Sequence, residues 1–454
     1  MIRRARSKPI SLSDDIASYV TPFLCQTVKN YGKNSFAWFG PRPRVTLMNP
    51  GLIKDVLTKI YDFRKPNTNP LTRVLVTGLV NHEEEKWAKH RRIINPAFHL
   101  KKLENMVPAF HQSCSEMISK WEEMVSNEGW CELDVWPCLV NLTSDVISRA
   151  AFGSSYEEGK RIFHLIDQLR YLTQQLIQSV YIPGWRFLPT KLNKKLKACD
   201  TEIRCSLKGV INKREKAMKA GEVDNDDLLG TLMEANSREI QENGGGTGMS
   251  LTDVIDECKI FYFAGQETTS VLLVWTMVLL AHHPIWQSRA REEVLRVFGH
   301  NKPDFNGLNR LKIVTMILYE VLRLYPPAVQ LIRLVGKETK LGNLVLPAGV
   351  EISIPNILIH RDPELWGDDA GEFKPERFAE GVSMATKNQS SFLPFSSGPR
   401  ICIGQNFAMM EAKIALAMIL QHFEFELSST YTHSPVLVLT AHPQYGANMI
   451  LRKL

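Results

Sequence analysis

The segment Phe395-Ser-Ser-Gly-Pro-Arg-Ile-Cys-Ile-Gly404 decides how the rest of the chain is interpreted. Glycine and proline recur in and beside it, so it is predicted to be a loop and neither helix nor strand. The residues concerned are Pro394, Gly398, Pro399 and Gly404. A helical run rich in alanine and methionine follows at Gln405 to Gln421. The loop therefore places its cysteine at the start of a helix, where unpaired backbone N–H groups favour a thiolate.

The cysteine of this loop, Cys402, has neighbours that suit a flat anionic ligand. Arg400 lies two residues before it and supplies a cation that can hold a negative group. Phe395 supplies an apolar cover, and the glycines allow a close approach of backbone or ligand to the sulfur. A thiolate in such surroundings indicates an axial haem ligand. The alternative is a tight turn that carries a buried free cysteine.

The pattern Phe-x-x-Gly-x-Arg-x-Cys-x-Gly, which ends at Gly404, resembles the haem-binding loop of the cytochrome P-450 superfamily. The resemblance implies a mainly α fold with small β-sheets (α+β), in which haem lies between a long central helix and the Cys402 loop. It also implies that residues 1–454 form a single catalytic domain. Haem b is the expected cofactor, with Cys402 as its metal ligand and Phe395, Arg400 and Gly404 in contact with it.

Composition agrees with a soluble globular protein of a reducing compartment. The 454 residues are 44% apolar and 23% charged. None of the eight cysteines forms a Cys-x-x-Cys pair, and their spacing predicts neither a zinc site nor a disulfide framework. The net charge of +7 suits an acidic protein partner or an anionic membrane surface. Nucleic acid is excluded as a partner because no recognition motif accompanies the scattered basic residues.

The N-terminus lacks a sequence that could cross a membrane. No apolar run reaches the roughly 18 residues that a span requires, and the opening Met-Ile-Arg-Arg-Ala-Arg has no signal core behind it. Eukaryotic members of the family usually begin with a membrane anchor and a proline-rich hinge. We therefore expect either a truncation or an incomplete gene model, and by resemblance a location on the cytosolic face of the endoplasmic reticulum membrane.

Local signals predict a mainly helical chain. A strand hairpin is expected at residues 35–48, and further strands at residues 344–346 and 350–354. The acidic and then glycine-rich segment Gly221–Gly248 is expected to be a solvated connector. Helices are predicted at residues 21–31, 50–60, 84–95, 103–125, 136–151, 160–179, 192–220, 250–283 and 311–324. Between the helices at 160–179 and 192–220, Pro183-Gly184 marks the position where the family carries a mobile lid.

Trp87 and Arg91 are four residues apart and share one face of the predicted helix at residues 84–95. Taken alone, the helix is typical of a basic surface helix, because His90 and Arg92 flank the arginine. In the family, a Trp-x-x-x-Arg pair on this helix donates hydrogen bonds to a haem propionate. The resemblance assigns that role to Trp87 and Arg91.

The helix predicted at residues 250–283 contains the sequence Ala264-Gly-Gln-Glu-Thr-Thr269 at its centre. Glycine weakens a helix interior by about 1 kcal/mol, and such local conflicts mark functional sites. Ala264 and Gly265 leave space for a flat cofactor, and the Thr268 hydroxyl can bond the carbonyl one turn back and admit water. By resemblance, Glu267 and Thr268 are catalytic and deliver protons during oxygen activation. The alternative is a core helix with an incidental polar notch.

Glu320 and Arg323 lie on one face of the predicted helix at residues 311–324. An exposed pair of this kind adds only about 0.2–0.5 kcal/mol. The family has a buried Glu-x-x-Arg here, joined by an arginine from a Pro-Glu-Arg-Phe segment, which this chain has at Pro375–Phe378. We expect Glu320, Arg323 and Arg377 to form one buried network that fixes the loop before Cys402.

The segment after Tyr325-Pro326-Pro327 is predicted to be extended. By resemblance, Val329, Leu331 and Ile332 face the substrate and Arg333 reaches a haem propionate. Arg333 is the one charged residue that stands out in this segment, so the pocket is expected to accept a bulky apolar molecule.

Several runs look similar to the plant branch that includes secologanin synthase and triterpenoid oxidases, notably residues 87–99, 330–342, 360–378 and 439–446. The resemblance implies a haem-thiolate monooxygenase that oxidises a terpenoid or steroid-like substrate with O2 and electrons from NADPH-cytochrome P-450 reductase. Two alternatives stay open at this point. One is a haem-thiolate isomerase or dehydratase that needs no reductase, and the other is a haem-binding protein without catalysis.

Overall fold

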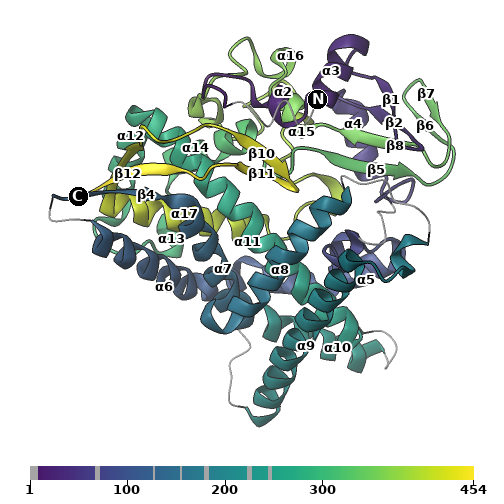
Figure 1. Ribbon diagram of the computed structural model, residues 1–454, viewed down its shortest axis with the longest axis horizontal. Coiled ribbons are helices and arrows are strands. Elements are labelled where there is room, and N and C mark those ends of the chain that lie inside the picture. Colours follow the sequence, from purple (N-terminus) through teal and green to yellow (C-terminus); the bar gives the residue numbers. More distant parts are fainter. Residues whose placement is uncertain are drawn as a thin grey trace. The chain divides into compact units, whose positions relative to one another are not determined.

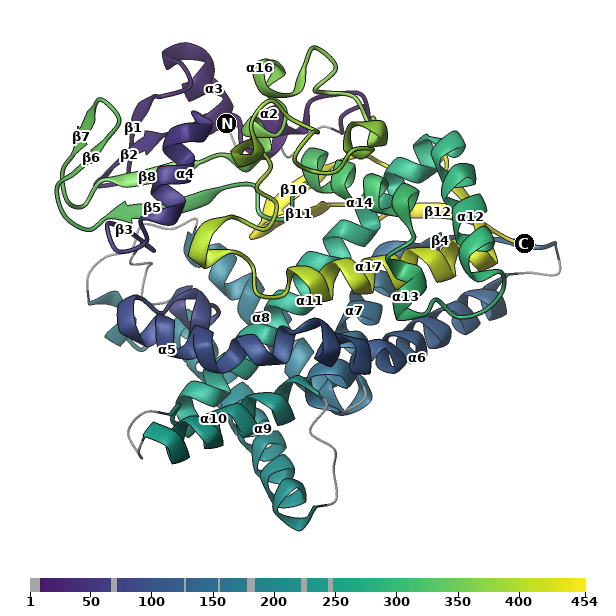
Figure 2. The same ribbon diagram turned by 180° about the vertical axis from the view of Figure 1, so that it is seen from behind.

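The computed structural model describes residues 9–66, 72–125, 128–153, 156–177, 184–221, 227–243 and 248–454. The chain divides into two compact units. The first unit comprises residues 1–66, 114–140 and 268–454, and the second comprises residues 67–113 and 141–267. Figure 1 and Figure 2 show the chain from opposite sides, and the strands among the described residues all belong to the first unit.

The described α-helices are α2 (Ile16–Val20), α3 (Pro22–Tyr31), α4 (Pro50–Thr58), α5 (Glu84–Ile94), α6 (Leu100–Met124), α7 (Val135–Phe152), α8 (Tyr156–Ile177), α9 (Lys191–Ala220), α10 (Leu228–Asn243), α11 (Leu251–His282), α12 (Pro284–Phe298), α13 (Phe305–Leu308), α14 (Lys312–Leu324), α15 (Asn356–Ile359), α16 (Pro363–Trp366) and α17 (Gln405–His422). Single turns of 3-10 helix are η1 (Thr72–Val74), η2 (Gly78–Val80), η3 (Asn95–Phe98), η4 (Trp185–Phe187), η5 (Pro375–Phe378), η6 (Gln389–Ser391) and η7 (Gly398–Arg400). The chain is thus mainly helical, as its sequence predicts.

The strands are β1 (Phe36–Phe39), β2 (Arg42–Thr46), β3 (Phe63–Arg64), β4 (Trp130–Asp134), β5 (Leu331–Val335), β6 (Thr339–Leu341), β7 (Leu344–Leu346), β8 (Glu351–Ile354), β9 (Phe423–Leu427), β10 (Pro435–Val438), β11 (Thr440–Pro443) and β12 (Asn448–Lys453). They form a five-stranded sheet in the order β1-β2-β8-β5-β3, a three-stranded sheet β4-β12-β9 and two hairpins, β6-β7 and β10-β11. This α+β composition confirms the expected fold class.

The five-stranded sheet carries a core that holds the N-terminal and C-terminal segments of the first unit together. β2 runs parallel to β8, while β5 runs antiparallel to β8, so segments from both ends of the chain meet in one sheet. Ile352 and Ile354 of β8 are fully buried and pack with Ile53 and Leu57 of α4. Fixing β5 in this way also fixes the segment that contains Arg333.

The long helix α11 begins at a capping box. The Ser250 Oγ accepts a hydrogen bond from the Asp253 N–H (3.2 Å), and the Asp253 carboxylate accepts one from the Ser250 N–H (3.1 Å). This confirms the predicted start. Among the described residues, α11 alone is long and apolar enough to cross a membrane, but 72% of its most apolar stretch is buried, as in the core helix of a globular protein.

The predicted connector at residues 221–248 is wrong, because α10 (Leu228–Asn243) lies within it. Leu228, Leu229 and Leu232 are buried, and they give the helix an apolar face that the acidic and glycine-rich flanks obscure. The break predicted at Pro183 falls outside the described residues. The described chain resumes at Gly184, which has a φ of +87°, a left-handed conformation that glycine adopts readily.

Candidate active site

The loop that carries Cys402 is closed by its own backbone. The Cys402 N–H donates to the Phe395 carbonyl (2.9 Å), and the Ile401 N–H donates to the Gly398 carbonyl (3.0 Å). Gly398 has a φ of +70°, and a Cβ there would lie 2.6 Å from the Leu57 carbonyl oxygen of α4. Only glycine fits this conformation and this contact, so the loop packs directly on the α4 backbone.

Cys402 lies at the surface of the first unit, just before α17 begins at Gln405. Arg400 and Gly404 are half-buried beside it. A thiol that is accessible at a helix N-terminus and close to a cation has the environment in which the thiolate is the favoured form. A soft thiolate with nearby cations is the donor set that haem iron accepts, so the residues fit a haem-thiolate centre.

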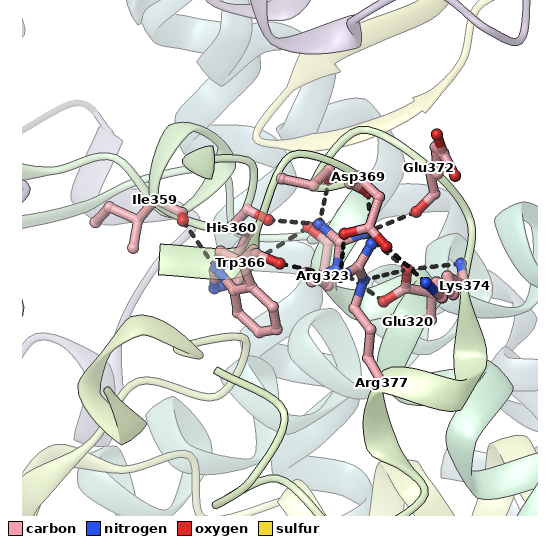
Figure 3. Close-up of polar contacts among 10 residues, drawn as sticks. Glu320, Arg323, Ile359, His360, Trp366, Asp369, Glu372, Lys374 and Arg377 are labelled. Atoms are coloured by element: carbon pink, nitrogen blue, oxygen red, sulfur yellow. Dashed lines mark hydrogen bonds and ion pairs between the residues drawn. The ribbon is translucent and has the colours of Figure 1, made fainter. Parts of the chain in front are cut away.

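Arg323 of α14 is fully buried and is the centre of the polar network in Figure 3. Its Nε and Nη2 donate to the two oxygens of Glu320, at 2.7 Å each. Its remaining donors reach backbone carbonyls of the loops that follow β8, at His360, Ala370 and Glu372. All five donors of the guanidinium are thereby used, which is what a buried cation requires.

Arg377 joins the same network from η5. Its Nε lies 3.4 Å from the Glu320 carboxylate, and its Nη1 lies 2.7 Å from the Asp369 carboxylate. The hydrogen bond from Arg377, together with Lys374, lowers the pKa of Asp369 to about 2. The structure therefore brings Glu320, Arg323 and Arg377 together and adds Asp369, which no local motif in the sequence indicates.

His360 links this network to the cysteine loop. The Leu393 N–H donates to its Nε2 (2.9 Å), so the ring proton is on Nδ1, which faces the Arg323 carbonyl (3.3 Å). Burial, followed by the Arg323 charge, lowers the pKa of His360 to about 3 and keeps the ring neutral. Leu393 lies two residues before Phe395. The network thus holds the start of the loop through a neutral histidine.

The centre of α11 combines buried and accessible polar groups. Thr268 is exposed although the helix around it is largely buried, while Glu267 is 5% exposed. A Cβ on Gly265 would lie 2.8 Å from the Ile147 Cδ1 of α7, so this glycine permits close helix packing. The Thr143 hydroxyl of α7 also donates to the Gln266 carbonyl (3.1 Å), which satisfies one backbone group of the notch.

Glu411 of α17 has a buried carboxyl close to Thr269 of α11, the residue that follows Thr268. Glu411 is 1% exposed, and neither of its oxygens makes a hydrogen bond of normal geometry with a described residue. Burial raises the pKa of the Glu411 carboxyl well above its usual value, and the Thr269 hydroxyl offsets only part of this effect. Burial therefore favours the protonated, neutral form of this carboxyl. The sequence analysis missed it because one glutamate in an apolar helix carries no motif.

Trp87 and Arg91 of α5 lie together, as their spacing predicts. With Ala88 and Arg92, and with residues of η3 and its end, they line a shallow hollow of about 440 Å³ in the second unit. Trp87 is 8% exposed and is one of the residues that line this hollow. Arg92 is paired with the Glu239 carboxylate (2.5 Å), so Trp87 and Arg91 are the two residues here that are chemically suited to an anionic oxygen.

Arg333 of β5 is 2% exposed, and its Nη1 donates to the Ile332 carbonyl (3.0 Å). Val329 is buried, whereas Leu331 and Ile332 are half-buried. These three apolar side chains and the buried cation follow one another along one short segment, which the sheet holds in place.

Comparison with known proteins identifies the family. The sequence profile described as Cytochrome P450 matches residues 19–444. The chain belongs to the cytochrome P450 family. It is 60% identical to "Cytochrome P450 72A397" of Kalopanax septemlobus and 58% identical to "Cytochrome P450 72A15" of Arabidopsis thaliana, over 100% of this chain and 88% of each relative. It is also 56% identical to "11-oxo-beta-amyrin 30-oxidase" of Glycyrrhiza uralensis, over 100% of this chain and 87% of the relative.

As a member of the cytochrome P450 family, the chain is a monooxygenase that uses a haem-thiolate cofactor, a redox partner and a small organic substrate. This confirms the expected enzyme class. The sequence-predicted residues fall into five groups: the Cys402 loop, the Arg323 network, the notch of α11, the Trp87–Arg91 hollow and the segment from Val329 to Arg333.

Proposed function

We propose that the chain hydroxylates an apolar terpenoid or steroid-like molecule, with haem b held by Cys402 and electrons supplied from NADPH by cytochrome P-450 reductase. The observation that carries the substrate class is the 56% identity to a relative named as an oxidase of a β-amyrin derivative. The apolar segment at Val329, Leu331 and Ile332 supports it, because burial of a bulky hydrocarbon requires an apolar wall.

When bound, the haem would supply oxygen activation. The residues of this chain would bind the haem and handle protons. Cys402 donates the thiolate, and its loop holds the sulfur in place through the Phe395 carbonyl. Trp87, Arg91 and Arg333 offer N–H donors to the propionates. Thr268, which is exposed, and the adjacent Glu267, which is buried, would hold and pass on protons during the reaction.

The location follows from the family rather than from a described segment. We propose attachment to the cytosolic face of the endoplasmic reticulum membrane, where the reductase partner is reached. The test is expression of a green fluorescent fusion of the full-length gene in leaf cells, followed by membrane fractionation. Recovery of the fusion in the cytosolic fraction would contradict this location.

The substrate class is tested with purified protein, reductase, NADPH and a panel of triterpenoids, steroids and iridoids, with products read by mass spectrometry. We expect a product 16 mass units heavier than one apolar pentacyclic or steroidal substrate, since one oxygen atom is inserted. Turnover without NADPH would instead favour an isomerase. If no terpenoid in the panel is converted while the reduced protein still gives a thiolate-type carbon monoxide spectrum, the substrate class is wrong but the cofactor assignment stands.

The proton role of Thr268 has its own test. Thr268→Ala removes the exposed hydroxyl without adding volume, so haem and substrate binding should be kept. We expect NADPH consumption to continue while product falls about 100-fold or more and hydrogen peroxide rises, which is the loss expected for a proton-transfer group. Thr276→Ala, in which a buried hydroxyl that bonds the Leu272 carbonyl is removed from the same helix, is the matched control. Equal coupling in both variants would exclude Thr268 from proton delivery.

A further inference from the structure

Three polar residues outside the motifs meet in the second unit. Glu257 of α11 and His90 of α5 are both fully buried, and the His90 Nδ1 lies 2.6 Å from the Glu257 Oε1. The Leu79 N–H of η2 donates to the other oxygen, Oε2, at 2.9 Å. The His82 Nε2 lies 3.8 Å from Oε1. One carboxylate therefore joins α5, η2 and α11.

This group is a set of hydrogen bonds and not a metal centre, although its three side chains are close enough to suggest one. Two ligand atoms of a tetrahedral zinc lie roughly 3.3 Å apart, because each bond is about 2.0–2.1 Å long. The 2.6 Å separation of the His90 Nδ1 and the Glu257 Oε1 is shorter and has the length of a charge-assisted hydrogen bond.

The backbone of η2 is shaped to reach this carboxylate. Gly78 has a φ of +60°, and a Cβ there would lie 2.6 Å from the Glu257 Oε2. Any other residue would push the carboxylate away and would be strained as well. The close approach lets the next residue, Leu79, donate its N–H to the buried oxygen.

A second contact lies one helical turn away from the first. Asp253 is four residues before Glu257, and Lys86 is four residues before His90. The Lys86 Nζ lies 2.7 Å from the Asp253 Oδ1, so α5 and α11 are joined by two parallel links. The Lys86 side chain is 51% exposed, and this outer link is worth little, whereas the inner link is fully buried.

The inner link sets the rotation of α5 about its own axis. Consecutive residues of an α-helix are rotated by about 100°, so fixing His90 toward α11 also fixes the direction of Trp87 and Arg91. We propose that Glu257 is a positioning residue for the haem site: it holds α5 through His90 so that Trp87 and Arg91 point at a haem propionate. This inference rests on the proposed propionate role of that pair.

The test is a double-mutant cycle with haem loss as its readout. The rate at which each holoprotein transfers haem to excess apomyoglobin is measured for wild type, Glu257→Ala, Arg91→Ala and the double variant. If Glu257 acts through Arg91 and Trp87, each single variant should lose haem about tenfold faster or more, and the rate of the double variant should fall clearly below the product of the two single effects. Lys86→Ala, which breaks only the exposed link, should stay near the wild-type rate.

Two further variants separate positioning from general stability. Glu257→Gln keeps the volume and one acceptor oxygen for Leu79, and its amide can donate to His90, so haem retention should be largely restored. If Glu257→Ala does not fold, the cycle is run with Glu257→Asp, whose shorter chain keeps the charge but cannot reach both partners. The carbon monoxide spectrum should stay of the thiolate type throughout, because Cys402 is untouched.

The outcomes separate the two claims. Multiplicative effects in the double variant, or a wild-type rate of haem loss in both Glu257→Ala and Glu257→Asp, would overturn the positioning role of Glu257 and leave the propionate role intact. A wild-type rate of haem loss in Arg91→Ala would overturn the propionate role itself, and the inference with it.

Discussion

At the scale of single residues, the chain depends on buried charges that have every partner they need. Arg323 uses five donors on Glu320 and three backbone carbonyls. Removing one member of such a group leaves the other charge buried and unpaired, which is far more harmful than losing an exposed pair. We therefore expect the network to act on folding and on the position of the cysteine loop, not on the reaction.

Arg323→Met tests this argument. We expect it to lower the free energy of unfolding by about 3–5 kcal/mol, because the Glu320 carboxylate keeps its burial and loses its main partner. Urea denaturation followed by circular dichroism measures the change. Arg289→Ala removes the exposed ion pair with Glu376 and should change the free energy by less than about 1 kcal/mol. Similar losses in the two variants would show that burial of the pair is not what matters.

His360 predicts how stability depends on pH. Its pKa is about 3 in the folded chain, against about 6.5 for an unfolded histidine, so the unfolded state binds more protons between these values. The stability from the neutral ring is complete above pH 6.5 and is lost as the pH falls toward 3. Between pH 6.5 and 5 the loss should be about 2 kcal/mol larger in wild type than in His360→Gln, as measured by urea denaturation at each pH. Parallel pH profiles of the free energy of unfolding in the two proteins would contradict this prediction.

The pH dependence of stability that Glu411 contributes has the opposite sign to that of His360. Its folded pKa lies well above the usual value, so the unfolded state releases a proton that the folded state keeps, and stability falls as the pH rises above about 4.5. Glu411→Gln keeps the shape and removes the titration. We expect the variant to be more stable than wild type at pH 7 and to lose that advantage near pH 4. A variant that is less stable at pH 7 would mean that the acid has a partner that the amide cannot replace.

At the scale of elements, local signals predicted helices and turns well. Gly32 ends α3 with a φ of +88°, and the Ser250–Asp253 capping box begins α11. Both signals act within a few residues, so they are visible in the sequence. The helix α10 was missed because the acidic and glycine-rich residues beside it dominate the local composition. Its buried face is defined by neighbours elsewhere in the second unit, as at Leu232.

Long-range partners in the candidate site were predicted only where a family motif names them. The Glu320–Arg323 pair is three residues apart and follows from spacing and resemblance. Asp369 and His360 join it through the folded loops, and His90 reaches Glu257 across 167 residues. No local pattern carries such a contact, because it is created by tertiary packing. The roles of the motif residues in catalysis stay predictions until they are measured.

The contact between the cysteine loop and α4 can be tested at Gly398. Gly398→Ala places a Cβ against the Leu57 carbonyl and forces a left-handed backbone on alanine. We expect the loop to shift, haem content after purification to fall several-fold, and helix content to stay unchanged. Gly371→Ala is the matched control, since its Cβ would meet nothing and its φ is ordinary. Haem is quantified by the pyridine haemochrome spectrum, and full occupancy in Gly398→Ala would show that the loop tolerates the shift.

At the scale of the whole molecule, the relevant property is charge. The chain carries 55 lysines and arginines against 48 aspartates and glutamates, a net charge of +7. A basic surface attracts an acidic partner over a distance of about 8–10 Å at ordinary ionic strength, and salt screens the attraction. If an acidic reductase delivers the electrons, its encounter with this chain should depend on salt, whereas entry of an apolar substrate should not.

This difference can be measured on one preparation. The rate of reductase-dependent haem reduction should fall by about tenfold between 0.05 and 0.5 M NaCl, because electrostatic steering of association is lost. The dissociation constant of the apolar substrate, read from the shift of the haem absorption band, should stay constant or decrease slightly over the same range, since burial of hydrocarbon is not weakened by salt. If the reduction rate is independent of salt while substrate binding weakens as salt rises, the excess positive charge attracts the substrate and not the redox partner.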